Sequence, residues 1–377
     1  MNDRAKVASL TPEILPADAT VTELLRPIVG YLTKIKGATD LFVNRPGEVF
    51  VKGGSEKVRF AATELTFERC MSLAGAIARF TNQTISAKHP ILSAQLPGGE
   101  RMQIVIPPAV ENGTVSLSIR VPGSVVRSIE EYERSGVFNR FVWAKSSHYE
   151  ERKHELAEHE RKMFDALCAK RLGEFLRLAV RNNTTIAFIG ATGSGKTSLM
   201  KSCAQLIPLE ERLLTIEDTH ELELSQEDRV HMYYSHGGQG QADLTPGELI
   251  QSGLRMNPDR ILLGEVRGAP ALELIDALQT GHAGSMTTYH AESCAEAYER
   301  YWGMCVQHPS SKQRSRDEVM PIIRRLLPVI VHMVAQVERD ASGAATGFAR
   351  FVKEVSYDPI RNLVATYGDA TLLRANT

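Results

Sequence analysis

The chain has 377 residues, 43% hydrophobic and 24% charged, a composition typical of a soluble globular protein with room for two or three domains. Its 44 basic and 45 acidic residues give a net charge of -1, without the basic excess usual in proteins that bind nucleic-acid phosphates. Five cysteines without a CxxC pair favour a reducing cytoplasm and argue against a zinc site or a disulfide framework.

No segment predicts insertion into a membrane. The N-terminus lacks the apolar run of a signal peptide. The best candidate for a membrane span, residues 326–337, is shorter than the ~18 apolar residues required and contains Pro328 and His332. We therefore expect a soluble or peripheral protein.

The first half predicts an α+β domain, which we assign to residues 1–140. Apolar residues at 41–43 and 49–51 flank a Pro-Gly turn, which predicts a hairpin, and residues 67–77 show helical spacing. Period-2 alternation predicts two further strands, over 101–106 and 115–121. Arg101 and Arg120 both fall on their polar face.

Residues 145–162 are nearly all charged or polar, which predicts an exposed helix or a mobile linker. We assign residues 141–163 to this linker and 164–377 to a C-terminal domain. There, short apolar strands at 184–189, 212–216, 260–263 and 285–289 alternate with helical patterns. This order favours an α/β domain with a mostly parallel sheet.

The strand ending at Ile189 is followed by a complete P-loop. Together with the parallel sheet, this motif gives a RecA-like P-loop NTPase as the expected fold class. Its glycines allow backbone N–H groups to surround phosphate oxygens at a helix N-terminus. Lys196 would reach the β- and γ-phosphates of ATP, and the Thr197 hydroxyl would bind Mg²⁺. The residues expected to bind the nucleotide here are Gly190, Ala191, Thr192, Gly193, Ser194, Gly195, Lys196, Thr197 and Ser198.

Two carboxylates follow predicted strands and are candidates for the hydrolytic chemistry. Glu265 ends the apolar strand 260–263 with Gly264 in place of the usual Asp, so we expect it to polarise water or to lie in the second shell of the metal. Glu217 ends the strand 212–216. Since the carboxyl ends of parallel strands meet at one edge, both carboxylates should flank the γ-phosphate.

Two histidines bracket the strand 285–289. His282 precedes this strand and His290 follows it, so each is a candidate for the nucleotide site. Isolated histidines are more often structural, and their residue type alone leaves both readings open.

Four elements in this order resemble the traffic ATPase superfamily of secretion and pilus motors. They are the P-loop, an Asp box, a Walker B strand and a His box, at residues 190–197, 215–218, 263–267 and 280–290. Further segments resemble the type IV secretion branch, at residues 44–49, 96–107, 118–122 and 254–260. The tetracysteine insert typical of type II assembly ATPases is absent. Residues 268–270 depart from the family pattern, and the tail beyond about 337 matches weakly.

The resemblance implies a hexameric ATPase at the cytoplasmic face of the bacterial inner membrane. Its cofactors would be ATP and Mg²⁺, with Thr197 and Glu217 as metal ligands, and Arg101 and Arg120 would reach the nucleotide across an interdomain cleft. Implied partners are the coupling protein, the larger assembly ATPase and the transported substrate.

Other functions remain open at this point. A nucleic-acid translocase would share the P-loop, but the near-neutral charge gives no strong evidence for direct nucleic-acid binding. A type II secretion or type IV pilus motor would use the same chemistry, and the first-half motifs argue against it. A nucleotide-gated scaffold without turnover is disfavoured by the two carboxylates and the P-loop lysine.

Overall fold

A computed structural model of the chain describes residues 19–53, 56–121, 126–143, 149–234, 244–340, 342–343 and 345–361. Contacts divide it into two compact units, with the boundary at residues 122–123. Among the described residues, none of the helices combines the length and apolar character needed to cross a bilayer.

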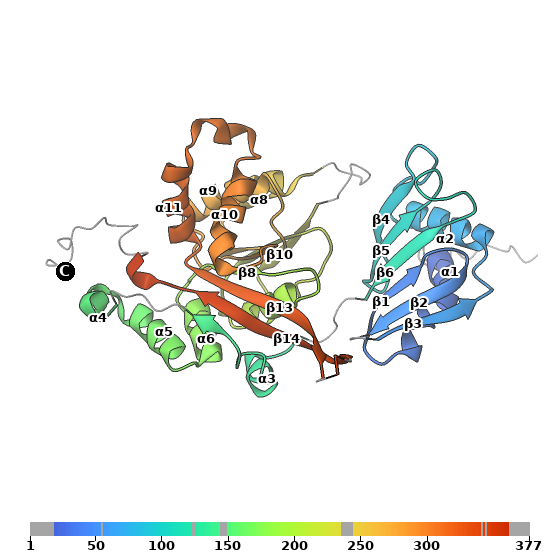
Figure 1. Cartoon of the computed structure of the whole chain (residues 1–377). Coiled ribbons are helices and arrows are strands. Elements are labelled where there is room, and N and C mark those ends of the chain that lie inside the picture. Colours follow the sequence, from blue (N-terminus) through green and yellow to red (C-terminus); the bar gives the residue numbers. More distant parts are fainter. Residues whose placement is uncertain are drawn as a thin grey trace, which may run out of the picture. The chain divides into compact units, whose positions relative to one another are not determined.

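The first unit is a six-stranded antiparallel sheet in the order β3-β2-β1-β6-β5-β4. Its strands are β1 (Ala38–Val43), β2 (Gly47–Gly53), β3 (Glu56–Ala62), β4 (Ile91–Gln95), β5 (Arg101–Val105) and β6 (Ser116–Arg120). The helices α1 (Ala19–Val29) and α2 (Phe67–Phe80) cover one face (Figure 1), with a short η1 (Leu32–Lys34) between α1 and β1. The α+β class, the hairpin and the strand pair expected from the sequence are confirmed.

The second unit is an eight-stranded sheet in the order β10-β9-β11-β12-β8-β13-β14-β7. Among the described strands of this sheet, only β13 and β14 pair antiparallel, so the mostly parallel sheet predicted from the sequence is confirmed. The strands are β7 (Val142–Trp143), β8 (Ile186–Ile189), β9 (Leu213–Glu217), β10 (Arg229–Tyr233), β11 (Arg260–Leu263), β12 (Met286–Tyr289), β13 (Val329–Arg339) and β14 (Ala345–Ser356).

Helices cover both faces of this sheet (Figure 1), and an apolar core lies on each side. One face carries α3 (Ile129–Arg134), α5 (Glu158–Cys168), α6 (Leu172–Arg181) and α7 (Lys196–Ala204). The other carries α8 (Pro246–Leu254), α9 (Pro270–Gln279), α10 (Cys294–Cys305) and α11 (Arg316–Leu326). The shorter elements are α4 (Tyr149–Arg152), η2 (Lys153–Glu155) and η3 (Pro309–Gln313).

Local sequence explains where several of these helices begin. The side chains of Ser128, Thr245 and Ser315 each accept the backbone N–H three residues on, and a glutamate at that position returns the hydrogen bond. These capping boxes satisfy helix N–H groups that have no partner within the helix. In the centre of the second sheet, β8, β9, β11 and β12 are buried from end to end, as expected for parallel strands covered on both faces.

The sequence analysis placed the end of the first domain at residue 140, whereas in the structure the two units divide at residues 122–123. Ile129, Phe138 and Phe141 are buried in the core of the second unit, so the segment from 126 onward folds with it. The described part of the charged segment, from residue 149 onward, also folds with this unit. This part forms α4, η2 and the start of α5, and Tyr149 and Leu156 pack against Ile360.

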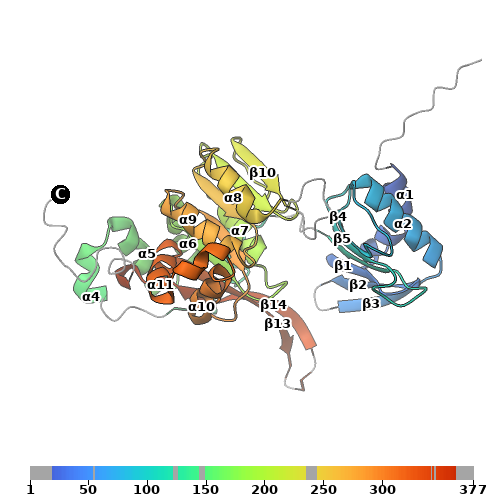
Figure 2. The same ribbon diagram turned by 90° about the horizontal axis from the view of Figure 1, so that it is seen from above.

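The apolar run 326–337, weighed above as a membrane span, is largely the strand β13. It pairs with β8 on one side and β14 on the other, which places it inside the sheet. Beyond the body of the sheet, β13 and β14 continue as a hairpin (Figure 2). Strand β14 was not predicted, because it lies in the tail where the sequence pattern was weak.

At the amino end of the sheet, one buried arginine joins three elements. Arg260 is 1% exposed and donates two hydrogen bonds of 2.6 Å to the Glu211 carboxylate. It also donates to the Val180 carbonyl at 2.8 Å and to the Asn183 amide oxygen at 2.6 Å. A Cβ at Gly284 would lie 2.8 Å from the guanidinium, so only glycine fits beside it.

We predict that Arg260→Ala destabilises the second unit by about 3–5 kcal/mol, because it leaves the Glu211 carboxylate partly buried without its cation. The measurement is denaturant unfolding followed by circular dichroism. The matched control is Arg255→Ala, an exposed arginine nearby, which should change the stability by less than ~0.5 kcal/mol. Equal midpoints for the two variants would show that the buried contacts of Arg260 are dispensable.

Candidate nucleotide-binding site

The P-loop connects β8 to α7 through backbone conformations that favour glycine. Gly190, Gly193 and Gly195 have φ angles of 140°, 76° and 97°, in the region that side chains rarely adopt. Helix α7 begins at Lys196, directly after Gly195. The N–H groups of its first turn have no partner within the helix, and the helix dipole favours an anion there.

Gly190 cannot carry a side chain for a second reason. A Cβ at this position would lie 2.0 Å from the carbonyl oxygen of Met333, which belongs to the neighbouring strand β13. The backbones of the P-loop and β13 therefore approach as closely as glycine allows. Any other residue at position 190 would push these two backbones apart.

Lys196 is 7% exposed, and its ammonium group is held within the loop. It donates to the carbonyl oxygens of Gly190 at 2.9 Å and Ala191 at 3.0 Å. Burial lowers the pKa of Lys196, the nearby Glu265 carboxylate opposes this effect, and the Arg267 guanidinium adds to it. The Lys196 ammonium is thus held by two neutral carbonyl oxygens, and an anion bound in the loop could replace them as its partner.

Two further groups belong to the P-loop. The hydroxyl oxygen of Ser194 is buried and has no hydrogen-bond partner among the described residues. Arg350 of β14 donates from Nε to the Gly193 carbonyl at 2.9 Å, so the tail of the chain also supports the loop. Sequence reasoning missed Arg350, because no motif surrounds it.

Glu265 and His290 lie together beside the loop. His290 Nδ1 is 3.0 Å from the Gly190 carbonyl oxygen, and its Nε2 is 3.1 Å from Glu265 Oε1. Arg267 donates to Glu265 Oε2 at 2.6 Å. Burial alone would raise the pKa of Glu265, but Arg267, His290 and Lys196 together bring it below its usual value, so the carboxylate is ionised near neutral pH.

Gly264, the departure noted in the Walker B strand, lies against β9. A Cβ there would be 3.4 Å from Glu217 Cγ and 3.5 Å from the Ile216 carbonyl oxygen, which is tight packing. The same carbonyl accepts the N–H of Gly264 at 2.9 Å. The glycine thus lets the backbones of β9 and β11 stay paired up to their carboxyl ends.

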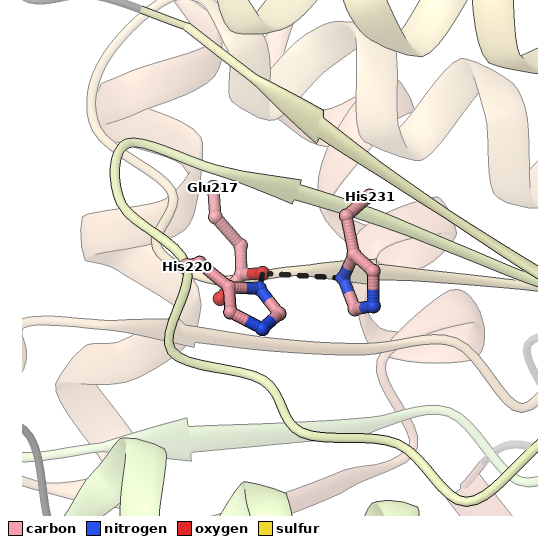
Figure 3. Close-up of side chains that lie close together, drawn as sticks. All are labelled: Glu217, His220 and His231. Atoms are coloured by element: carbon pink, nitrogen blue, oxygen red, sulfur yellow. Dashed lines mark ion pairs between the residues drawn. The ribbon is translucent and has the colours of Figure 1, made fainter. Parts of the chain in front are cut away.

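Glu217, expected near Glu265, makes its contacts elsewhere. It is 2% exposed, and Oε1 accepts the N–H groups of Glu221 at 3.0 Å and Leu222 at 2.8 Å. Its other oxygen faces His220 and His231 (Figure 3). Sequence reasoning did not single out these two histidines, which lie in no recognised metal-ligand spacing.

His282 lies at the opposite end of β12 from His290. Its Nδ1 is 2.9 Å from the carbonyl oxygen of Pro258, which precedes β11. In a parallel sheet this is the amino edge, whereas the P-loop follows the carboxyl end of β8. Within this unit the structure therefore does not bring His282 to the P-loop.

In the first unit, Arg101 and Arg120 face each other directly across β5 and β6. Met102 and Ile119, which alternate with them, are buried, so both arginines lie on the other face, as the alternation predicted. Arg120 pairs with Asp40 at 2.9 Å, and half of its side chain remains exposed. The Asp40 contact was not predicted.

Comparison with known proteins agrees with these features. The model of the family "Type II/IV secretion system protein" matches residues 161–355. Type IV secretion system protein VirB11 of Brucella suis is 41% identical over 85% of this chain and 86% of its own length. The VirB11 protein of Bartonella quintana is 39% identical over 91% of this chain and 94% of its own.

A solved structure extends the likeness to three dimensions. The crystal structure of the VirB11 ATPase from the Brucella suis type IV secretion system, in complex with sulphate, has a TM-score of 0.50 and 37% sequence identity. The match covers 93% of this chain and 98% of that one. The resemblance drawn from the motifs is thereby confirmed. The chain belongs to the type II/IV secretion system protein family, among its VirB11-like members.

Proposed function

We propose that this chain is an Mg²⁺-dependent ATPase that powers a type IV secretion apparatus. The observation that carries the proposal is the convergence on the Gly190 carbonyl, which both Lys196 and His290 contact, with Glu265 next to His290. A cation, an ionised carboxylate and an anion-binding loop in one place are the parts that phosphoryl transfer requires. The transport role rests on the VirB11 relatives.

Three features of the loop support binding of a nucleoside triphosphate. Residues 190–198 offer backbone N–H groups at a helix N-terminus. Among the described residues, the buried Ser194 hydroxyl has no hydrogen-bond partner, and the Lys196 ammonium donates to carbonyl oxygens alone. Phosphate oxygens are stronger acceptors for an ammonium than carbonyls, since charge-assisted hydrogen bonds are about twice as strong as neutral ones.

For Mg²⁺ we propose Thr197 as the ligand at the P-loop, since its hydroxyl lies in the first turn of α7. Glu217 is the second proposed ligand, and it would bind Mg²⁺ through Oε2, since Oε1 already accepts two backbone N–H groups. When bound, Mg²⁺ would neutralise charge on the phosphates. Thr197 follows β8 and Glu217 ends β9, so both proposed ligands come from the carboxyl edge of the sheet.

Glu265 would orient the attacking water and accept a proton from it. Its lowered pKa keeps it an acceptor near neutral pH, and Arg267 fixes one of its oxygens. His290 would position this carboxylate relative to the P-loop, because it contacts both.

Arg101 and Arg120 would act on the same nucleotide from the first unit. They are paired across β5 and β6, and two guanidiniums together suit the oxygens of a triphosphate. Contacts that depend on the γ-phosphate would let hydrolysis shift the two units relative to each other, since a ligand shifts an equilibrium only through differential contacts.

We further propose a homohexamer that works at the cytoplasmic face of the inner membrane. There it would meet the coupling protein, the larger assembly ATPase and the transported substrate. These proposals rest on membership of the family rather than on any contact within the chain. Mass determination with ATP and Mg²⁺ present measures the oligomeric state directly.

We predict that Lys196→Ala abolishes ATP turnover, because the loss of a charge on the developing phosphates costs roughly 10²-fold or more in rate. The measurement is phosphate release by the purified protein, with circular dichroism to show that the fold is retained. Lys312→Ala, which removes an exposed lysine of the same unit, serves as the control and should keep the wild-type rate. Turnover by Lys196→Ala near that of the control is incompatible with an ATPase of this type.

We predict that Glu265→Gln still binds ATP but cleaves it ~10²-fold more slowly, because shape is retained while the proton acceptor is lost. Binding is measured with a fluorescent ATP analogue and cleavage in a single turnover. The exposed Glu292→Gln, just beyond the same histidine, is the control. If Glu265→Gln loses binding together with its fold, the carboxylate is structural.

We predict that Arg101→Ala and Arg120→Ala each lower the ATPase rate or ATP affinity by about 10- to 100-fold, with partial rescue by lysine, because charge-assisted hydrogen bonds of ~1.5–3 kcal/mol are lost. Arg59→Ala is the matched control, since Arg59 also pairs with a carboxylate, Glu48, on this sheet. Alanine variants that match the wild type would place both arginines outside the site.

A further inference from the structure

Three polar side chains meet at the free edge of the eight-stranded sheet. Glu217 ends β9, His220 follows it in the connecting loop, and His231 lies within β10. The parallel register pairs His231 with Thr215 and Tyr233 with Glu217, so strand pairing itself brings His231 to the face on which Glu217 points. Figure 3 shows the two imidazole rings beside the carboxylate.

The distances suit ligands that share one cation. Glu217 Oε2 lies 3.8 Å from His231 Nδ1 and 3.9 Å from His220 Nδ1, and the three ligand atoms lie within 4.8 Å of one another. These separations are long for hydrogen bonds. Around a tetrahedral zinc ion with bonds of about 2.0–2.2 Å, neighbouring ligand atoms are ~3.4 Å apart, so closing the site requires only small shifts.

The carboxylate itself points to a missing partner. Glu217 is 2% exposed, and its Oε1 is satisfied by two backbone N–H groups. Its Oε2 is buried without a hydrogen-bond partner among the described residues. An anionic oxygen out of contact with water is costly unless a cation or a donor meets it, and this one faces two imidazole nitrogens.

The donor set selects the kind of cation. Two imidazole nitrogens and one carboxylate oxygen suit zinc and its transition-metal neighbours, whereas Mg²⁺ and Ca²⁺ prefer oxygen ligands. The Nδ1 atoms now lie 2.8 Å from the Thr215 hydroxyl and 2.9 Å from the Tyr233 hydroxyl. Metal binding would exchange these two hydrogen bonds for coordination. His220 is partly exposed, which leaves a path of entry.

We propose that Glu217, His220 and His231 form a binding site for a divalent transition metal of the zinc class. With three protein ligands, at least one coordination position stays open to water. The metal would join β9, its following loop and the edge strand β10. It would also hold Glu217 Oε2 away from the nucleotide, so that metal loading slows ATP turnover. This last consequence rests on the proposed function.

The test begins with direct binding of Zn²⁺ to the full chain without an affinity tag. Cys168→Ser serves as background, because this exposed thiol could bind zinc by itself. Chelator-treated protein is titrated with Zn²⁺ against a chromophoric chelator, and with Co²⁺ to record the visible absorption of a tetrahedral site. We expect one equivalent of metal and a tetrahedral Co²⁺ spectrum.

Variants locate the site. His220→Ala and His231→Ala should each weaken binding at least tenfold, since even partners of metal ligands are worth 10- to 100-fold in affinity. His154→Ala, which removes an exposed histidine of the same unit, should bind as the background protein does. Circular dichroism shows whether each variant folds. His231→Gln, which can still bond to Thr215, replaces His231→Ala if that variant does not fold.

The proposal is overturned if the chain binds no Zn²⁺, if binding is unchanged in both histidine variants, or if millimolar Mg²⁺ displaces the metal. The consequence for turnover is tested separately, as the ratio of ATPase rates with and without Zn²⁺. Zinc should slow the wild type several-fold and His231→Gln much less. If the protein binds Zn²⁺ but has no ATPase activity, the result counts against the proposed function and leaves the metal site intact. If it hydrolyses ATP normally but binds no Zn²⁺, only the metal site is refuted.

Discussion

The organisation of the candidate site depends on the backbone contact between Gly190 and β13. Because a Cβ would lie 2.0 Å from the Met333 carbonyl oxygen, only glycine fits at position 190. The carbonyl of the same residue accepts from Lys196 and lies against His290, which also meets Glu265. One glycine is therefore in contact with both the neighbouring strand and the charged groups of the site.

Charged groups of both signs meet at this site. Lys196 and Arg267 are positive, Glu265 is negative, and the Asp218 carboxylate also acts on Arg267. Burial lowers the pKa of Lys196, which reflects the cost of keeping its charge away from water. A bound polyanion would reduce this cost, so ligand binding and local stability should be coupled.

Local signals in the sequence were sufficient for much of the fold. The P-loop residues, the apolar strands beside the P-loop and the alternation that puts Arg101 and Arg120 on one polar face are all short-range patterns. The family followed from the order of its four motifs. Sequence also placed Glu217 and Glu265 at one sheet edge but could not tell which neighbours each would contact, because side-chain direction depends on tertiary packing.

Features that depend on pairing between distant segments were out of reach. His231 meets Glu217 only because β10 adds to β9 in one particular register, and Arg350 reaches Gly193 only because β14 folds back along β13. The charged run before α5 looked like a linker, since its few apolar residues, such as Tyr149 and Leu156, are too sparse to indicate a core.

The two strand orders also have consequences for how the chain folds. In the first unit most neighbouring strands are consecutive, and only β1 with β6 closes a long loop. In the second, β8 pairs with β12 and β13, which lie about a hundred residues or more along the chain. Loop closure makes such pairings slow. The first unit also leaves the ribosome earlier. It should therefore be complete while the larger sheet still exposes apolar strands, and in that interval the chain is most prone to aggregate.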